Sequence, residues 1–99
     1  MLKKRFYQGG NNCRVWFYLP TEVKADSVHL VGDFNDWDKN ANPMKVKKDG
    51  TFYTALTLET GRDYQFRYLL DKQRWENDWE ADAYIKNESG TENSVIKLS

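Results

Sequence analysis

The stretch that decides the fold is Tyr64-Gln-Phe-Arg-Tyr-Leu-Leu70, in which large apolar side chains alternate with polar ones. Successive side chains of a β-strand point to opposite faces, so Tyr64, Phe66 and Tyr68 should face a core. Gln65 and Arg67 should then face the other way. A helix would instead need apolar residues three or four apart over several turns. This stretch therefore predicts a half-buried strand.

The same alternation recurs on both sides of this segment. We expect strands at residues 3–7, 13–19, 28–31, 44–48, 51–58 and 95–98, with Asp49-Gly50 as a hairpin turn. No helical pattern persists for three turns, and residues 77–84 could form only one short helical turn. About seven or eight short strands with frequent turn signals predict an all-β fold, an antiparallel β-sandwich.

Length and composition limit the size of the domain and the kinds of partner that we expect. With 99 residues, we expect one domain over residues 1–99 with a single two-layer core. Fifteen basic residues balance 15 acidic ones, so we expect neither nucleic acid nor a membrane surface as a partner. A single cysteine, Cys13, and an N-terminus without an apolar run predict a cytoplasmic protein. We expect no cofactor.

Two segments run from a strand into a turn that ends on a tryptophan. They are Val28-His-Leu-Val-Gly-Asp-Phe-Asn-Asp-Trp37 and the stretch from Tyr64 to Trp75. A tryptophan outside the alternating pattern is hard to bury, and its flat ring suits a partly apolar ligand such as a sugar. Trp37 and Trp75 are therefore candidates for a sugar-stacking platform, and the alternative for each is a lid over the end of the sandwich.

Other chemistries lack the spacing they need. Asp36-x-Asp38-x-Asn40 begins like a calcium loop, but Ala41 stands where that loop requires glycine. His29 has no second histidine for a zinc site, and we expect it to be a half-exposed sheet residue. Glycoside hydrolysis needs two carboxylates held across a cleft, and the acidic residues here crowd one segment. We therefore expect neither a metal site nor catalytic residues.

Several motifs together resemble a known family. In chain order they are Val15-x-Phe17-x-Leu19-Pro20, Val28-x-Leu30-Val31-Gly32-Asp33-Phe34-Asn35-Asp36-Trp37, Asp49-Gly50-x-Phe52, Gly61-x-x-Tyr64-x-Phe66-x-Tyr68, Trp75-x-x-Asp78 and Gly90-Thr91-x-Asn93-Ser94-Val95. This order resembles the isoamylase N-terminal, or early set, domain, which is carbohydrate-binding module family 48. That family includes the glycogen-binding domain of the AMP-activated kinase β subunit. The resemblance covers about residues 15–98.

The resemblance implies an immunoglobulin-like sandwich that binds α-1,4-linked glucan without cleaving it. It places the family's stacking tryptophans on Trp37 and Trp75, and its threonine and asparagine contacts on Thr91 and Asn93. The family's glycogen-binding lysine falls on Gln65, whose amide can still donate to and accept from a sugar hydroxyl. The leucine that reaches into the sugar ring in the kinase subunit falls near Ser89.

Further candidates and rival functions stay open. Arg67 shares the outward row of Gln65 and could contact sugar oxygens, or it could be a solvated surface arginine. Trp79 could contact the ligand or pack against Tyr84. The favoured partner is glycogen, starch-like polymer or maltooligosaccharide. The alternatives are a domain that binds another protein, and an accessory module of a glucan-active enzyme, because sandwiches host many functions.

Overall fold

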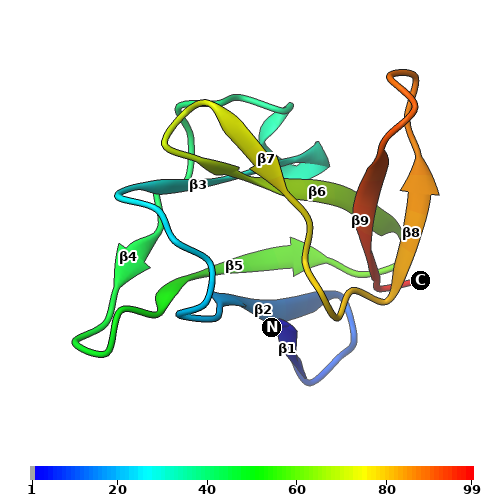
Figure 1. Cartoon of the computed structure of the whole chain (residues 1–99). Helices are drawn as coiled ribbons and strands as arrows, with labels where there is room; N and C mark the ends of the chain where they lie inside the picture. Colours follow the sequence, from blue (N-terminus) through cyan, green and yellow to red (C-terminus); the bar gives the residue numbers. More distant parts are fainter. Residues whose placement is uncertain (1) are drawn as a thin grey trace.

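The computed structural model describes residues 2–99. Within these residues the chain forms nine strands in two antiparallel sheets, which lie face to face as a sandwich (Figure 1). The first sheet has the order β1 (Leu2–Phe6), β2 (Asn12–Leu19), β5 (Phe52–Glu59) and β4 (Lys45–Val46). The second has the order β3 (Val28–Gly32), β6 (Asp63–Leu70), β9 (Glu92–Lys97) and β8 (Ala83–Lys86), with β7 (Arg74–Glu76) also paired to β6. The all-β sandwich predicted from the alternation is confirmed.

The alternating side chains meet between the two sheets. Phe17 of β2 packs edge-on against Phe66 of β6 with ring centroids 5.3 Å apart, and Phe66 packs in the same way against Tyr68 at 5.7 Å. Phe34, from a short 3-10 helix η1 (Asp33–Asn35), covers one end of this cluster with its ring 5.8 Å from that of Phe17. The inward row predicted for residues 64–70 is therefore the centre of the core.

Two features differ from the sequence-based expectation. The short helical turn considered for residues 77–84 does not form, since this segment has a non-helical turn at Trp79 and Glu80 and then enters β8. The strands β7 and β8 were not predicted, so the described chain has nine strands where about seven or eight were expected. Three of the four β8 residues are exposed, so β8 carries no alternating apolar signal. Backbone pairing with β9 holds it in place.

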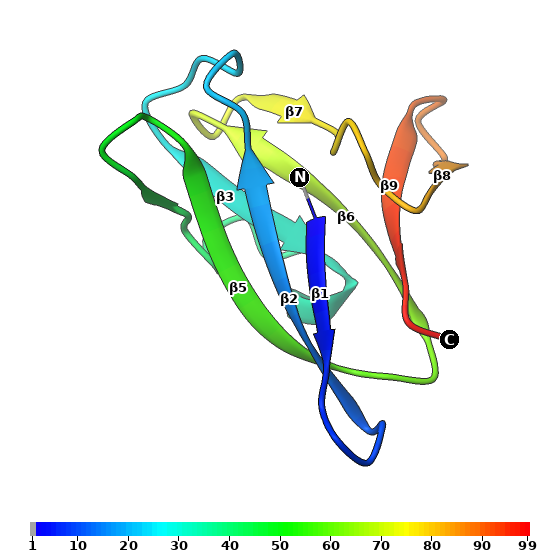
Figure 2. The same ribbon diagram turned by 90° about the horizontal axis from the view of Figure 1, so that it is seen from below.

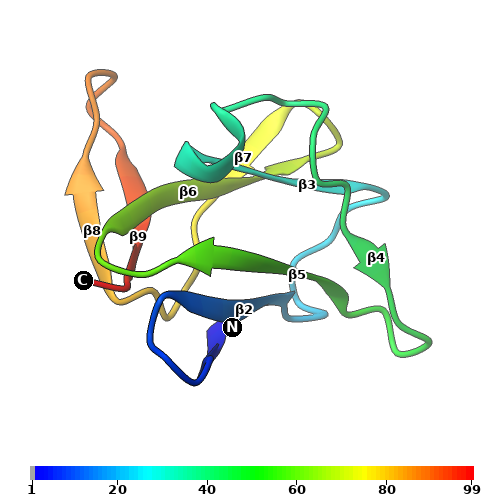
Figure 3. The same ribbon diagram turned by 180° about the vertical axis from the view of Figure 1, so that it is seen from behind.

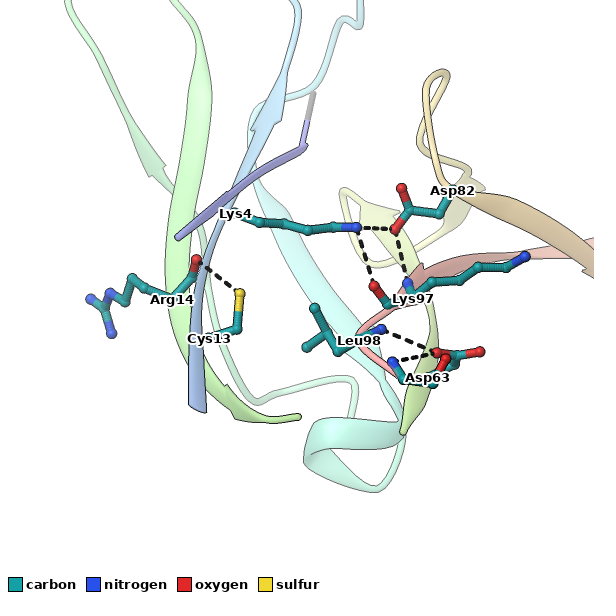
Figure 4. Close-up of polar contacts among 8 residues, drawn as sticks. Lys4, Cys13, Arg14, Asp63, Asp82, Lys97 and Leu98 are labelled. Carbon is teal, nitrogen blue, oxygen red and sulfur yellow. Dashed lines mark hydrogen bonds and ion pairs between the residues drawn. The ribbon is translucent and has the colours of Figure 1, made fainter. Parts of the chain in front are cut away.

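Polar contacts join the N-terminal strand to the opposite sheet (Figure 4). Lys4 of β1 forms an ion pair with Asp82 and also donates a hydrogen bond to the backbone carbonyl of Lys97 in β9. Asp82 in turn accepts a hydrogen bond from the Lys97 backbone N–H. Cys13 lies fully buried on the inner face of β2. Among residues 2–99 no helix is long and apolar enough to cross a bilayer.

Both edges of β6 are occupied, and this arrangement positions the candidate site. β3 pairs along one edge of β6 from Phe66 to Leu70. On the other edge, β9 pairs with the first half of β6 and β7 pairs with the last three residues. Three connections therefore lie next to the same outer face of β6 (Figure 3). They are the turn that follows β3, the β6–β7 hairpin and the β8–β9 turn.

Candidate functional site

Trp37 is placed by a tight turn at the end of β3. Asp36 and Trp37 both have positive φ values, 56° and 57°, and the Trp37 backbone N–H donates to the carbonyl of Gly32 at 2.9 Å. Positive φ is unusual for residues other than glycine, so surrounding contacts must hold this conformation. The turn brings the Trp37 side chain back toward the sheet from which the chain has just emerged.

The carboxylate of Asp33 fixes this side chain. One of its oxygens accepts a hydrogen bond from the Trp37 indole Nε1–H at 2.9 Å. The other accepts from the backbone N–H of Gln65 in β6 at 2.7 Å. Asp33 therefore connects the indole to the neighbouring strand and restricts the orientation of the ring. This role of Asp33 could not be predicted from the sequence, because Asp33 and Gln65 are distant from each other in the chain.

Trp75 does not end a turn, as the sequence suggested, but lies in the short strand β7 opposite Leu69 of β6. The reversal occurs earlier, at Asp71 and Lys72, which have φ values of 52° and 56°. Successive positive φ values match the right-handed twist of a hairpin, so β7 folds directly back along β6. Trp75 is 36% exposed, which makes it one of the large apolar side chains left accessible on the surface.

Two cations lie over the Trp75 ring. The Arg67 guanidinium carbon lies 5.3 Å from the ring centroid and the Lys39 ammonium nitrogen lies 5.8 Å from it. Partial burial lowers the pKa of Arg67, against the opposing effect of the nearby Glu76 carboxylate. The Arg67 Nε atom is buried without a hydrogen-bond partner in the described chain.

The turn between β8 and β9 contributes a chain of amide and hydroxyl groups. The side-chain oxygen of Asn87 accepts from the backbone N–H groups of Ser89 and Thr91 at 3.0 and 3.2 Å. Its Nδ2 donates to the Asn93 side-chain oxygen at 3.1 Å, and Asn93 Nδ2 donates to Gln65 Oε1 at 3.1 Å. An asparagine that bonds to its own turn is a common device, and it orients every amide in this row.

These elements surround one open hollow of about 600 Å³. Its lining residues are Trp37, Arg67, Trp75, Asn87, Glu88, Ser89 and Asn93. Four sequence-based candidates, Trp37, Trp75, Asn93 and Arg67, thus share it. Gln65 and Thr91 do not line the hollow, but each is hydrogen-bonded to a residue that does. Gln65 accepts from Asn93, and Thr91 accepts from Arg67 at 3.5 Å.

Not every candidate residue lines the hollow, and not every lining residue was a candidate. Trp79 is 51% exposed and does not line the hollow. Asn87 and Glu88 line it and were missed by the sequence analysis. The signal for Asn87 was its position three residues before Gly90, which marks a turn but says nothing about a ligand. His29 is half-buried on the outer face of β3, as expected, and burial lowers its pKa.

The hollow combines two indole rings with amides that can both donate and accept. Such a surface suits a flat ligand with apolar faces and hydroxyl edges. The sequence model of the carbohydrate-binding module 48 (isoamylase N-terminal domain) family matches residues 4–85. The chain belongs to this family. The resemblance seen in the sequence is confirmed, and the match is to a family of binding modules.

Relatives of this carbohydrate-binding module 48 chain are much longer proteins. The 1,4-alpha-glucan branching enzyme GlgB of Butyrivibrio fibrisolvens is 33% identical over 69 residues, which cover 70% of this chain and 11% of the enzyme. The GlgB enzyme of Aquifex aeolicus is 37% identical over 70 residues, covering 63% of this chain and 11% of the enzyme. The NadR protein of Escherichia coli, a trifunctional NAD biosynthesis/regulator protein, is 36% identical over 59 residues, covering 60% and 14%. This chain therefore spans only about a tenth of the length of these branching enzymes.

Proposed function

We propose that this module binds α-1,4-linked glucan in the hollow between Trp37 and Trp75, and that it does so without cleaving the glucan. The observation that carries the proposal is that two indoles from separate segments line one open hollow beside oriented amides. Membership of a carbohydrate-binding family and similarity to branching enzymes that act on 1,4-alpha-glucan support the choice of ligand.

The energetics favour a weak site that acts on a polymer. Stacking of a ring on an aromatic side chain contributes about 1–3 kcal/mol, and sugar on indole belongs near the lower end. Each hydrogen bond to a hydroxyl adds about 0.5–1.5 kcal/mol. After the cost of association, a few such contacts give dissociation constants of about micromolar to millimolar. Glycogen offers many equivalent chains, so modules joined to one another or to an enzyme would gain from multivalency.

Arg67 and Lys39 affect how a sugar can stack on the Trp75 ring. Both cations lie within 6 Å of the Trp75 centroid, so a sugar that covers this ring must share it with them. We propose that Arg67 stays and donates to sugar oxygens, because it lines the hollow and is partly buried. Lys39 is exposed and does not line the hollow, so it can move aside at little cost.

Retardation in a gel that contains glycogen or amylopectin tests the proposal. We expect the native chain to be retarded, and Trp37→Ala and Trp75→Ala each to weaken binding about tenfold or more, which corresponds to about 1.4 kcal/mol. Trp79→Ala is the matched control, since Trp79 is exposed and outside the hollow. Equal retardation of all four folded proteins would refute the site. Release of shorter sugars from maltoheptaose by the pure chain would refute the non-catalytic assignment.

Asp33 gives a separate prediction, because it touches the indole and lies outside the set of lining residues. We expect Asp33→Asn to weaken glucan binding several-fold, since an amide cannot accept from both the Trp37 indole and the Gln65 backbone. Trp37→Phe keeps a flat ring without the N–H and should be insensitive to the change at Asp33. Affinity gels of the two single variants and the double variant measure this coupling. Additive losses would show that Asp33 does not act through Trp37.

The observation that favours a second reading is the length of the relatives. The matched region is 11% of each branching enzyme, and we propose as a second function that this module anchors a larger enzyme to glucan. In that arrangement the hollow would keep the same role and raise the local concentration of glucan near an active site. The binding experiment above applies unchanged.

A further inference from the structure

A second hollow lies on the opposite side of the sandwich, on the outer face of the sheet formed by β1, β2, β5 and β4. Figure 2 looks onto this sheet. The hollow measures about 280 Å³, roughly half the volume of the first. Its lining residues are Arg14, Trp16, Lys45, Tyr53, Thr54 and Ala55. None of them takes part in the proposed glucan site.

The hollow exists because one position in a row of large side chains is small. On β2 the outward residues include Arg14 and Trp16, and on β5 they include Ala55 and Tyr53. Ala55 pairs directly with Trp16 across the strands. Its methyl group fills little of the space that a larger side chain would occupy beside the indole. Ala55 therefore forms the floor, and the two aromatic residues form walls.

Cations without acidic partners surround this floor. Arg14 and Lys45 line the hollow, and no carboxylate does. The Arg14 guanidinium is held by a hydrogen bond from Nη1 to Thr57 Oγ1 at 3.0 Å, which leaves its remaining N–H groups available. Within residues 2–99 neither Arg14 nor Lys45 forms an ion pair. The zero net charge of the chain thus conceals a locally basic surface.

The lysines next to the hollow extend this surface. Lys3 lies over the Trp16 ring at 5.9 Å, and Lys47 lies over Tyr18 and Tyr53 at 5.1 and 5.5 Å. A neutral sugar in the hollow would displace water from these cations without pairing with them. An anionic ligand would pair with them, and a guanidinium binds phosphate oxygens through two parallel hydrogen bonds.

We propose that this hollow binds a phosphorylated monosaccharide. The sugar ring lies against Trp16 and over Ala55, and Arg14, two residues from Trp16 on the same face of β2, binds the phosphate. Lys45 and Tyr53 close the other end. The small volume suits one sugar ring, whereas the larger hollow on the other sheet suits a chain. This site is independent of the proposed glucan binding.

Titration calorimetry and ¹⁵N-labelled NMR spectra test the proposal with glucose 1-phosphate, glucose 6-phosphate, glucose, inorganic phosphate and AMP as probes. We expect a hexose phosphate to bind saturably and to shift the Trp16 indole and Ala55 amide signals. Glucose and phosphate alone should bind at least about tenfold more weakly. The Trp37 indole signal should not move, and Trp37→Ala should bind the hexose phosphate normally.

Two variants locate the site. Ala55→Leu fills the floor and Arg14→Gln removes the phosphate partner, so each should lower affinity about tenfold or more. Arg5→Gln is the matched control, because Arg5 pairs with Arg14 across the strands but does not line the hollow. If Ala55→Leu fails to fold, the affinity of Arg14→Gln and the NMR shifts of the native protein test whether the hexose phosphate binds in this hollow.

Three outcomes would overturn the proposal. They are absence of saturable shifts at Trp16 and Ala55, binding of AMP or of phosphate alone at least as tightly as the hexose phosphates, and unchanged affinity in the folded Arg14→Gln variant. None of these outcomes bears on glucan retardation by the Trp37 hollow. The proposal for one site can therefore be refuted without affecting the proposal for the other.

Discussion

Replacement of Gly32 by alanine is expected to lower the free energy of unfolding by about 3 kcal/mol or more. A Cβ atom at this position would lie 2.5 Å from the Gln65 carbonyl oxygen and 2.7 Å from the Phe66 Cβ atom. Both are parts of β6, which is paired on both edges, so the strand cannot retreat to make room. The Gly32 backbone is extended, with φ −176°, and the requirement is therefore one of space.

The same change would disturb the glucan hollow. Gly32 accepts the hydrogen bond from the Trp37 N–H, and the next residue, Asp33, binds both the indole and Gln65. Any shift of β3 away from β6 would separate these groups. We expect the Gly32→Ala protein that remains folded to bind glycogen more weakly than native protein.

Gly61→Ala is the control for Gly32→Ala. Gly61 has φ +87°, and a Cβ atom added there would meet no atom within 4 Å, so alanine costs only the strain of the left-handed conformation, about 1–2 kcal/mol. Urea unfolding of both variants measures the difference. If the two variants lose the same stability, the close approach of β3 and β6 is not the constraint described here.

The second large effect is expected at Asp78, which is fully buried with 0% exposure. Its carboxylate accepts from the Tyr68 hydroxyl at 2.8 Å and from the Glu80 backbone N–H at 2.8 Å, while its own N–H donates to Ser94 Oγ at 2.9 Å. Asp78→Ala would leave the buried Tyr68 hydroxyl without its acceptor. We expect a loss of about 3 kcal/mol in the free energy of unfolding.

The Asp78 effect should depend on pH. Burial raises the pKa of Asp78 above its ordinary value of 3.8, against the hydrogen bonds from Glu80 and Tyr68. A carboxyl with a raised pKa in the folded state contributes most to stability below the unfolded pKa, and this contribution falls as pH rises through the folded pKa. The stability difference between native protein and Asp78→Ala should therefore be largest in acid and shrink toward neutral pH.

Urea unfolding at a series of pH values measures this difference directly. Tyr68→Phe removes the other partner, and a double-mutant cycle with Asp78→Ala isolates the pair. Full additivity would show that the hydroxyl and the carboxylate do not interact. A stability difference that grows from acid to neutral pH would contradict a raised pKa of Asp78 in the folded protein.

Much of the fold could be predicted because it is encoded locally. In β2, β5 and β6, successive side chains alternate between the two faces of the strand, and the inward-facing rows lie toward the core as predicted. The Asp49-Gly50 hairpin joins β4 and β5 as expected. β7 and β8 escaped detection because they are short and mostly exposed, and pairing with β6 and β9 stabilises them. The burial of Asp78 could not be predicted, because its partners Tyr68 and Ser94 lie elsewhere in the chain.

The order of amino acids alone determined which side chains of β2, β5 and β6 face inward and which family the chain belongs to. Only the folded molecule decided that Trp37, Trp75 and Asn87 meet at one hollow, and that the cations of a neutral chain gather around Ala55 on the other sheet. The reason is physical. Alternation assigns a residue to a face of its own strand, whereas strand order and register decide which distant residues become its neighbours.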